Sequence, residues 1–153
     1  MNEIVPLNLP VADLKIRTLG DDRREIYDRW RGRWVNLTPE EWVRQNFVSM
    51  LVDQRGYLSG RIANEISIRL NSTARRCDTV VYDASRQPWM IVEYKAPDVE
   101  ITQKVFDQIV RYNMVLKAKY LTVSNGLRHF CCQIDYDQAG YRFLKDLPAY
   151  ESD

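Results

Sequence analysis

Two acidic residues and a lysine stand at a spacing that could support metal-assisted hydrolysis. Glu93 and Lys95 lie two residues apart at the end of the apolar run PWMIVEY, which predicts a strand. Residues two apart on a strand point to the same face, so both should share a face with Trp89 and Ile91. Charges in so apolar a strand are costly unless they are paired or bind a metal. The pair is therefore either a structural ion pair or part of a reactive site.

Asp78 is expected to lie opposite Glu93. A hairpin between DTVVYD and PWMIVEY, with a four-residue loop, would pair Asp83 with Pro88 and Asp78 with Glu93. Directly opposite residues have Cβ atoms about 5 Å apart, where like charges repel each other. A divalent cation would reverse that interaction, and Mg²⁺ suits because it combines one or two carboxylates with water and phosphate oxygens. A lysine beside such an ion could orient or deprotonate a bound water near a phosphate.

The surrounding segments predict an α/β fold. Thr38 is a predicted N-cap, Pro39 occupies the first helical position and Glu41 completes a capping box, so a helix begins here and runs towards Gly56. Apolar residues at helical spacing predict a second helix. Further strands and one short C-terminal element complete the expected set, with the second helix at 101–117, strands at 62–70, 120–124 and 128–134, and the short element at 141–147. The order is a helix, an antiparallel three-strand meander, a helix and further strands, which indicates a mixed sheet flanked by helices.

Residues 1–37 are expected to form an N-terminal extension packed on a domain of residues 38–153, the first twenty as an extended arm or edge strand. Residues 21–36 carry five arginines interleaved with aromatics that include Trp30 and Trp34. Arginine beside aromatic rings is typical of a nucleic-acid groove. The tryptophans could equally cap the core while the arginines pair with nearby acids. The pattern leaves both interpretations open.

The composition excludes several classes of function. The chain has 153 residues, which suits one domain, and a net charge of +1, which excludes a strongly basic nucleic-acid binder. His129 is the only histidine, so a zinc site built on several imidazoles is excluded, and the chain has no P-loop. The cysteines are odd in number and two are adjacent, which favours free thiols in a reducing cytoplasm. No secretory leader or membrane span is expected.

The run Arg76-Cys77-Asp78, followed by Glu93-Tyr94-Lys95, resembles the PD-(D/E)xK nuclease superfamily. More narrowly, it is similar to the N-terminal nuclease domain of type I restriction enzyme R subunits. Other segments resemble that family in its order: TPEEWVRQ its first helix, QIVRY its Q-x-x-x-Y helix, and Ser124-Asn125-Gly126 its T-N-G turn. Cys77 departs from the proline of the superfamily name, at a position with no ligand role.

The resemblance implies a restriction-endonuclease-like fold and Mg²⁺-dependent hydrolysis of DNA, with Mn²⁺ as an alternative ion. It implies that Asp78 and Glu93 bind the metal and that Lys95 acts on the attacking water. An acidic residue of the first helix completes such a site. Glu41 is the expected residue, with Glu40 as the alternative. The capping box would use the same Glu41 carboxylate, so the two roles compete.

The sequence offers further candidate residues around the site. Glu65 is an additional candidate for the acidic cluster. The resemblance implies that Gln108 and Tyr112 face the active site or the DNA backbone; alternatively, Tyr112 is core and Gln108 its solvated neighbour. The expected contacts to phosphate are made by three arginines: Arg44, Arg76 and Arg111.

The expected partners are DNA and a targeting or motor subunit, because the R subunit continues into an ATP-driven motor that this sequence lacks. The protein would then act alone or as a module targeted by a partner. Members of the superfamily often dimerise, so a homodimer is also considered. Two alternatives stay open: a catalytically silent DNA-binding or assembly module of the same fold, and an unrelated enzyme acting on a small phosphorylated substrate.

Overall fold

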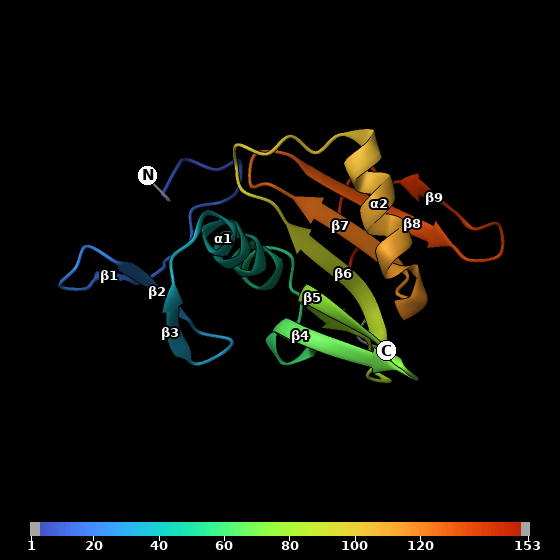
Figure 1. The fold of residues 1–153 in the computed structure, drawn as a ribbon, viewed down its shortest axis with the longest axis horizontal. Helices are drawn as coiled ribbons and strands as arrows, with labels where there is room; N and C mark the ends of the chain where they lie inside the picture. The colour runs from blue at the N-terminus through green and yellow to red at the C-terminus, as the bar shows by residue number, and fades with distance from the viewer. Residues whose placement is uncertain (1–3, 151–153) are drawn as a thin grey trace.

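The computed structural model describes residues 4–150 of the chain, which form two sheets with two α-helices (Figure 1). The helices are α1 (Pro39–Asp53) and α2 (Gln103–Asn113), and two short 3₁₀ turns cover Ser59–Arg61 and Met114–Leu116. The strands are β1 (Ile16–Thr18), β2 (Arg24–Asp28), β3 (Arg33–Asn36), β4 (Ile62–Leu70), β5 (Thr73–Tyr82), β6 (Pro88–Tyr94), β7 (Tyr120–Ser124), β8 (His129–Asp135) and β9 (Gly140–Phe143).

The larger sheet has the order β4-β5-β6-β7-β8-β9 and is mixed. Strands β4, β5 and β6 form an antiparallel meander, whereas β6 and β7 are parallel and are joined through α2. One core cluster packs α1 against one face of this sheet, and a second packs α2 against the other face. The predicted fold class, a mixed sheet flanked by helices, is confirmed.

Helix α1 begins where the sequence predicts. The Thr38 hydroxyl oxygen accepts a hydrogen bond from the Glu41 backbone N–H at 3.0 Å, and Pro39 is the first helical residue. The second half of the predicted capping box differs, because the Glu41 carboxylate accepts hydrogen bonds from other side chains. Charged donors within reach compete successfully with a backbone N–H for that carboxylate. The buried face of α1 packs through Phe47 and Leu51.

The β5–β6 register is the one predicted over its central residues and shifts at the hairpin end. Thr79 pairs with Val92 and continues towards the predicted Asp78–Glu93 pairing, but Tyr82 rather than Asp83 lies opposite Pro88. The sheet therefore has an extra β6 residue at this end. Such a bulge interrupts strict alternation.

The bulge changes where Trp89 packs. Its side chain joins the α1-side core, where its ring contacts Tyr57 and Tyr120, at centroid distances of 5.8 Å and 5.0 Å. Ile91 packs in the cluster on the α2 side. The prediction that both residues share the face of Glu93 is therefore wrong for Trp89.

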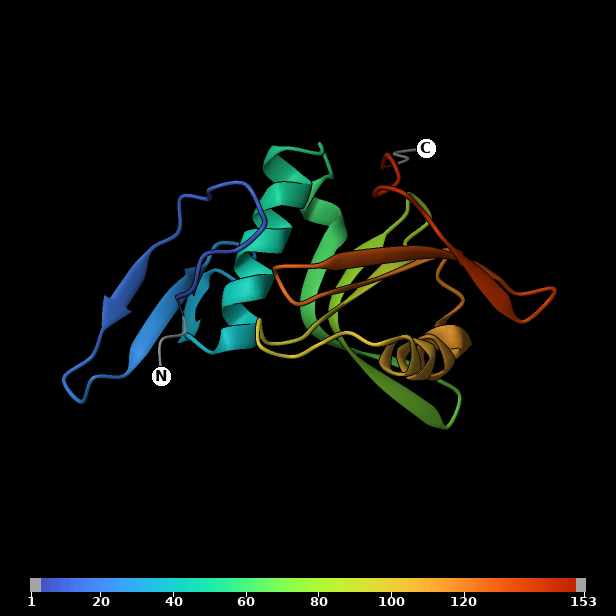
Figure 2. The same ribbon diagram turned by 90° about the horizontal axis from the view of Figure 1, so that it is seen from above.

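The N-terminal segment forms a separate antiparallel sheet, β1-β2-β3, which lies beside α1 (Figure 2). Among residues 4–20, the part of the predicted arm that the structure describes, only Ile16–Thr18 is a strand. The prediction of one arm or edge strand is replaced there by a docked segment and a small sheet. The Asn8 N–H donates to the Gly126 carbonyl at 2.8 Å. Gly126 has φ +85°, and an added Cβ would meet the Leu7 side chain at 2.7 Å.

The arginines of the small sheet are largely paired. Arg23 bonds Asp21, Arg31 bonds Asp28, and the Arg29 guanidinium contacts the Asp53 carboxylate at 2.9 Å. Trp30 packs against the α1-side core. These contacts favour the interpretation that the arginines pair with acids and that Trp30 caps the core. Trp34 instead packs on Tyr27, with ring centroids 5.4 Å apart, and on Arg17.

Helix α2 is shorter than predicted. Its N-cap is Thr102, and the α-helix ends at Asn113 before a 3₁₀ turn that closes at Lys117, whose φ is 59°. Strands β4, β6, β7 and β8 follow the predicted segments to within one residue, whereas β5 begins five residues before the predicted DTVVYD segment and β9 ends at Phe143. No helix within residues 4–150 is long and apolar enough to cross a membrane.

The three cysteines are free, as predicted, and all three are buried. Burial raises the pKa of Cys131 to about 11 and that of Cys132 to about 12. Both thiols are therefore protonated near neutral pH.

Candidate active site

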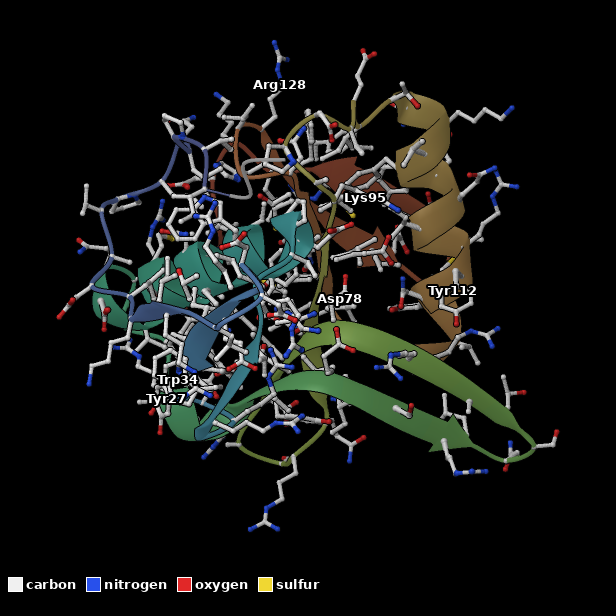
Figure 3. All side chains as sticks on the ribbon, turned by 60° about the vertical axis from the view of Figure 1, so that its left-hand side comes forward. Tyr27, Trp34, Asp78, Lys95, Tyr112 and Arg128 are labelled. Atoms are coloured by element: carbon white, nitrogen blue, oxygen red, sulfur yellow. The ribbon has the colours of Figure 1, made fainter. Side chains whose placement is uncertain are left out.

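Asp78, Glu93 and Lys95 are brought together by the central strands. Asp78 lies on β5, Glu93 lies near the end of β6, and Lys95 follows β6 directly. The backbone N–H of Lys95 donates to the Ser124 carbonyl at 2.9 Å, so the chain stays fixed against β7 beyond the end of the strand. Figure 3 shows Asp78 and Lys95 in the region between α1 and α2.

Direct contacts hold these three side chains. The Lys95 ammonium nitrogen lies 3.5 Å from a Glu93 carboxylate oxygen. Asp78 Oδ2 accepts a hydrogen bond from the Tyr94 backbone N–H at 2.9 Å. Their side chains are 31% (Asp78), 26% (Glu93) and 35% (Lys95) exposed, so solvent and a ligand can reach them.

The two carboxylates share an environment that disfavours negative charge. Burial raises the pKa of Asp78, against the opposing effects of the Tyr94 N–H and the Arg44 guanidinium. Burial also raises the pKa of Glu93, where the Lys95 charge opposes the effect and the Asp78 charge adds to it. A cation between two such carboxylates would stabilise both in their ionised form.

This pair of oxygen donors fits Mg²⁺. Within residues 4–150, no group of three or more histidine, cysteine or acidic residues converges in a way that could hold a metal. Mg²⁺ tolerates such a sparse set, because it keeps several waters and is bound through one or two carboxylates together with substrate phosphates.

Glu41 and Glu65 lie next to this pair but are bound by arginines. Glu41 accepts hydrogen bonds from Arg31 at 2.7 Å and Arg44 at 3.1 Å, and also from Gln45 at 2.7 Å. Glu65 is bonded by Arg44, and by Arg76 at 2.6 Å. The alternative first-helix acid, Glu40, is exposed. The structure thus brings Glu41 and Glu65 to the rim of the site without joining them to Asp78 and Glu93.

The three arginines that were predicted to contact phosphate lie in different surroundings. Arg44 is 3% exposed and its guanidinium is directed inward, so it does not present a surface to DNA. Arg76 has a side chain that is 71% exposed, although it bonds Glu65, and Arg111 is exposed on α2. Arg44 therefore does not lie at the surface as a phosphate contact would require, and it instead binds Glu41 and Glu65 inside the protein.

Gln108 and Tyr112 are both exposed on α2, so the alternative in which Tyr112 belongs to the core is wrong. Arg75 on β5 stacks on the Tyr112 ring at 4.5 Å and donates to the Tyr112 carbonyl at 2.9 Å. No sequence signal pointed to this contact. The contact between Glu41 and Arg44 had such a signal, because Arg44 follows Glu41 by three residues on the same helix.

A comparison with models of known protein families finds a match over most of the sequence. A model of the type I restriction enzyme R protein N terminus matches residues 39–148, which include α1, α2 and every strand of the larger sheet. Strands β1–β3 precede the matched region. Among curated proteins, no sequence matches the chain significantly. Because the match spans most of the sequence, the chain belongs to the type I restriction enzyme R protein N-terminal family.

Proposed function

We propose that this protein hydrolyses DNA phosphodiester bonds with Mg²⁺, and that Mn²⁺ can replace it. The observation that carries the proposal is the convergence of Asp78, Glu93 and Lys95 between the two helices of a nuclease-like α/β fold. Membership of a restriction enzyme family supports DNA as the substrate and a targeting or motor subunit as a partner in the cytoplasm.

Asp78 and Glu93 are the residues that would hold the ion. When bound, the ion would stabilise negative charge on the phosphate and make a coordinated water a better nucleophile. Lys95 is an ammonium paired with Glu93, and an ammonium has three donors and no acceptor. Its role in this state is therefore to orient water or a phosphate oxygen. To remove a proton from the water, it must first lose its own.

The test is cleavage of single-stranded, duplex and branched DNA with Mg²⁺, Mn²⁺ or EDTA. Lys95→Ala should lower the rate by at least about 100-fold, because a positioned proton-transfer or orienting group contributes on that order. Lys15→Ala is the matched control, since Lys15 is an exposed lysine before β1, and it should cleave like the wild type. Equal rates for Lys95→Ala and the control would contradict the assignment.

A catalytically silent DNA-binding module is the second candidate. The observation in its favour is that arginines, rather than a shared metal position, bind Glu41 and Glu65. Wild-type protein that binds DNA but cuts nothing with either metal would establish this alternative.

A further inference from the structure

Arg44 is a buried cation at the centre of the acidic cluster. One terminal nitrogen lies 3.1 Å from a Glu41 oxygen, and the other bonds Glu65 and lies 3.9 Å from Asp78. Its Nε has no hydrogen-bond partner among the described residues, and its guanidinium lies 5.7 Å from the Tyr94 ring centroid. An arginine keeps its charge at any physiological pH, so this cation is permanent.

The strand register explains why a cation is needed at this point. Asn64 pairs with Thr79 and Ile66 with Cys77, so Glu65 lies between these pairs, opposite Asp78. Like charges on directly opposite residues repel each other. Glu65 also has φ 52°, a left-handed backbone that is unfavourable for a residue with a Cβ. Arg44 holds the Glu65 carboxylate in this conformation from one side, and Arg76 holds it from the other.

The charges of the whole cluster nearly balance without a metal. Its five acidic members are Asp28, Glu41, Glu65, Asp78 and Glu93, and its four basic members are Arg31, Arg44, Arg76 and Lys95. A divalent ion added to a cluster with one excess negative charge leaves an excess of positive charge, which is costly in a partly buried site. Phosphate groups are anions that can both balance this excess and supply metal ligands.

We propose that Arg44 sets the number of carboxylates available to the metal. By engaging Glu41 and Glu65, it restricts the ion to Asp78 and Glu93, so that the free protein binds the ion weakly and DNA phosphates complete its coordination. This inference rests on the proposed function, because it concerns the same metal site. It makes Arg44 a positioning residue that couples metal binding to DNA binding.

The test measures Mn²⁺ binding to the DNA-free protein from the free-ion signal in electron paramagnetic resonance. Arg44→Gln should tighten Mn²⁺ binding by at least about tenfold, because it removes a unit charge a few ångströms from the carboxylates and releases Glu41 and Glu65. Arg44→Lys keeps the charge and should bind Mn²⁺ within a few-fold of wild type. Asp78→Asn in the Arg44→Gln background should abolish the tight binding. Arg44→Gln that is folded and binds no more tightly than wild type overturns the proposal, as does tight binding that survives Asp78→Asn.

A second comparison tests the proposal if Arg44→Gln alone does not fold. Arg44→Gln/Glu65→Gln removes a cation and an anion together, so it leaves no unpaired charge between these two positions. It should bind Mn²⁺ at least about tenfold more tightly than Glu65→Gln alone. Equal affinities overturn the proposal.

Cleavage assays separate this inference from the proposed function. Wild type that cleaves DNA while Arg44→Gln fails to tighten Mn²⁺ binding would leave the nuclease assignment standing and remove the role of Arg44. Tighter binding by Arg44→Gln in a protein that cleaves no DNA would support the role of Arg44 and remove the nuclease assignment.

Discussion

Asp28 is a fully buried carboxylate whose negative charge is matched by local donors. Its oxygens accept hydrogen bonds from the backbone N–H groups of Trp30 at 2.8 Å and Arg31 at 3.0 Å, and from the Arg31 side chain. Burial alone would raise the pKa of Asp28, but these bonds outweigh it and the pKa is lowered. This residue therefore links the stability of the protein to pH.

A lowered pKa in the folded protein stabilises the fold above the ordinary aspartate value, near 3.9, and this contribution is lost as pH falls through the folded pKa. Asp28→Asn should lower the free energy of unfolding at pH 7 by about 2 kcal/mol, because a charged acceptor becomes a neutral one. The difference between variant and wild type should shrink below about pH 4. Urea unfolding at pH 7 and pH 3 measures this, and a difference that is the same at both values would contradict the argument.

The sequence predicted the positions of those site residues that depend on strand periodicity. Asp78, Glu93 and Lys95 could be placed together because strand alternation and hairpin register are local properties. The burial of Arg44 could not be predicted, because it depends on how α1 packs on β4 and β5, and a sequence pattern alone does not specify that distance. The roles of all these residues stay predictions until the experiments above are made.

Elements with strong end signals were predicted closely, and irregular ones were not. Thr38 and Pro39 fixed the start of α1. Helix α2 begins two residues later than predicted, after its N-cap Thr102, and its last predicted turn is a 3₁₀ segment. The bulge that redirects Trp89 has no distinctive residue in its sequence. The β1–β3 sheet was also missed, because its strands are only three to five residues long.

The N-cap of α1 gives a test at the scale of one element. Thr38→Ala should lower the free energy of unfolding by about 1 kcal/mol, since it removes the acceptor for the Glu41 N–H at 3.0 Å. Thr38→Ser retains a hydroxyl and should restore most of that loss. Chemical denaturation of the three proteins distinguishes a capping effect, for which Thr38→Ala and Thr38→Ser must differ, from a general intolerance of substitution.

At the scale of the whole molecule, the N-terminal segment packs against the α1 side of the family-matched region. Ile26 and Leu37 are buried, Leu9 packs against the α1-side cluster, and Arg31 reaches across to Glu41. The predicted division into an extension of residues 1–37 and a domain of 38–153 stays a prediction, and the family match covers residues 39–148. The contacts of the N-terminal segment indicate that the family-matched region depends on it for stability.

Deleting residues 1–37 should lower the melting temperature by more than about 10 °C or abolish cooperative unfolding, because several buried apolar side chains and the Arg31–Glu41 pair are lost together. Differential scanning calorimetry of the two chains makes the measurement. Val11→Ala is the control for the segment, since Val11 is fully exposed and should not change the melting temperature. An unchanged melting temperature in the truncated chain would show that the extension is dispensable.

The three buried thiols provide an internal reporter for every one of these variants. A thiol reagent attacks the thiolate, and Cys131 and Cys132 are shielded by the core and protonated well above neutral pH. A folded variant should therefore react slowly with a chromogenic disulfide, and an opened one should release three equivalents quickly. The rate of this reaction thus reports how often the core opens, with no engineered reporter group. It separates a variant that has lost activity from one that has lost its fold.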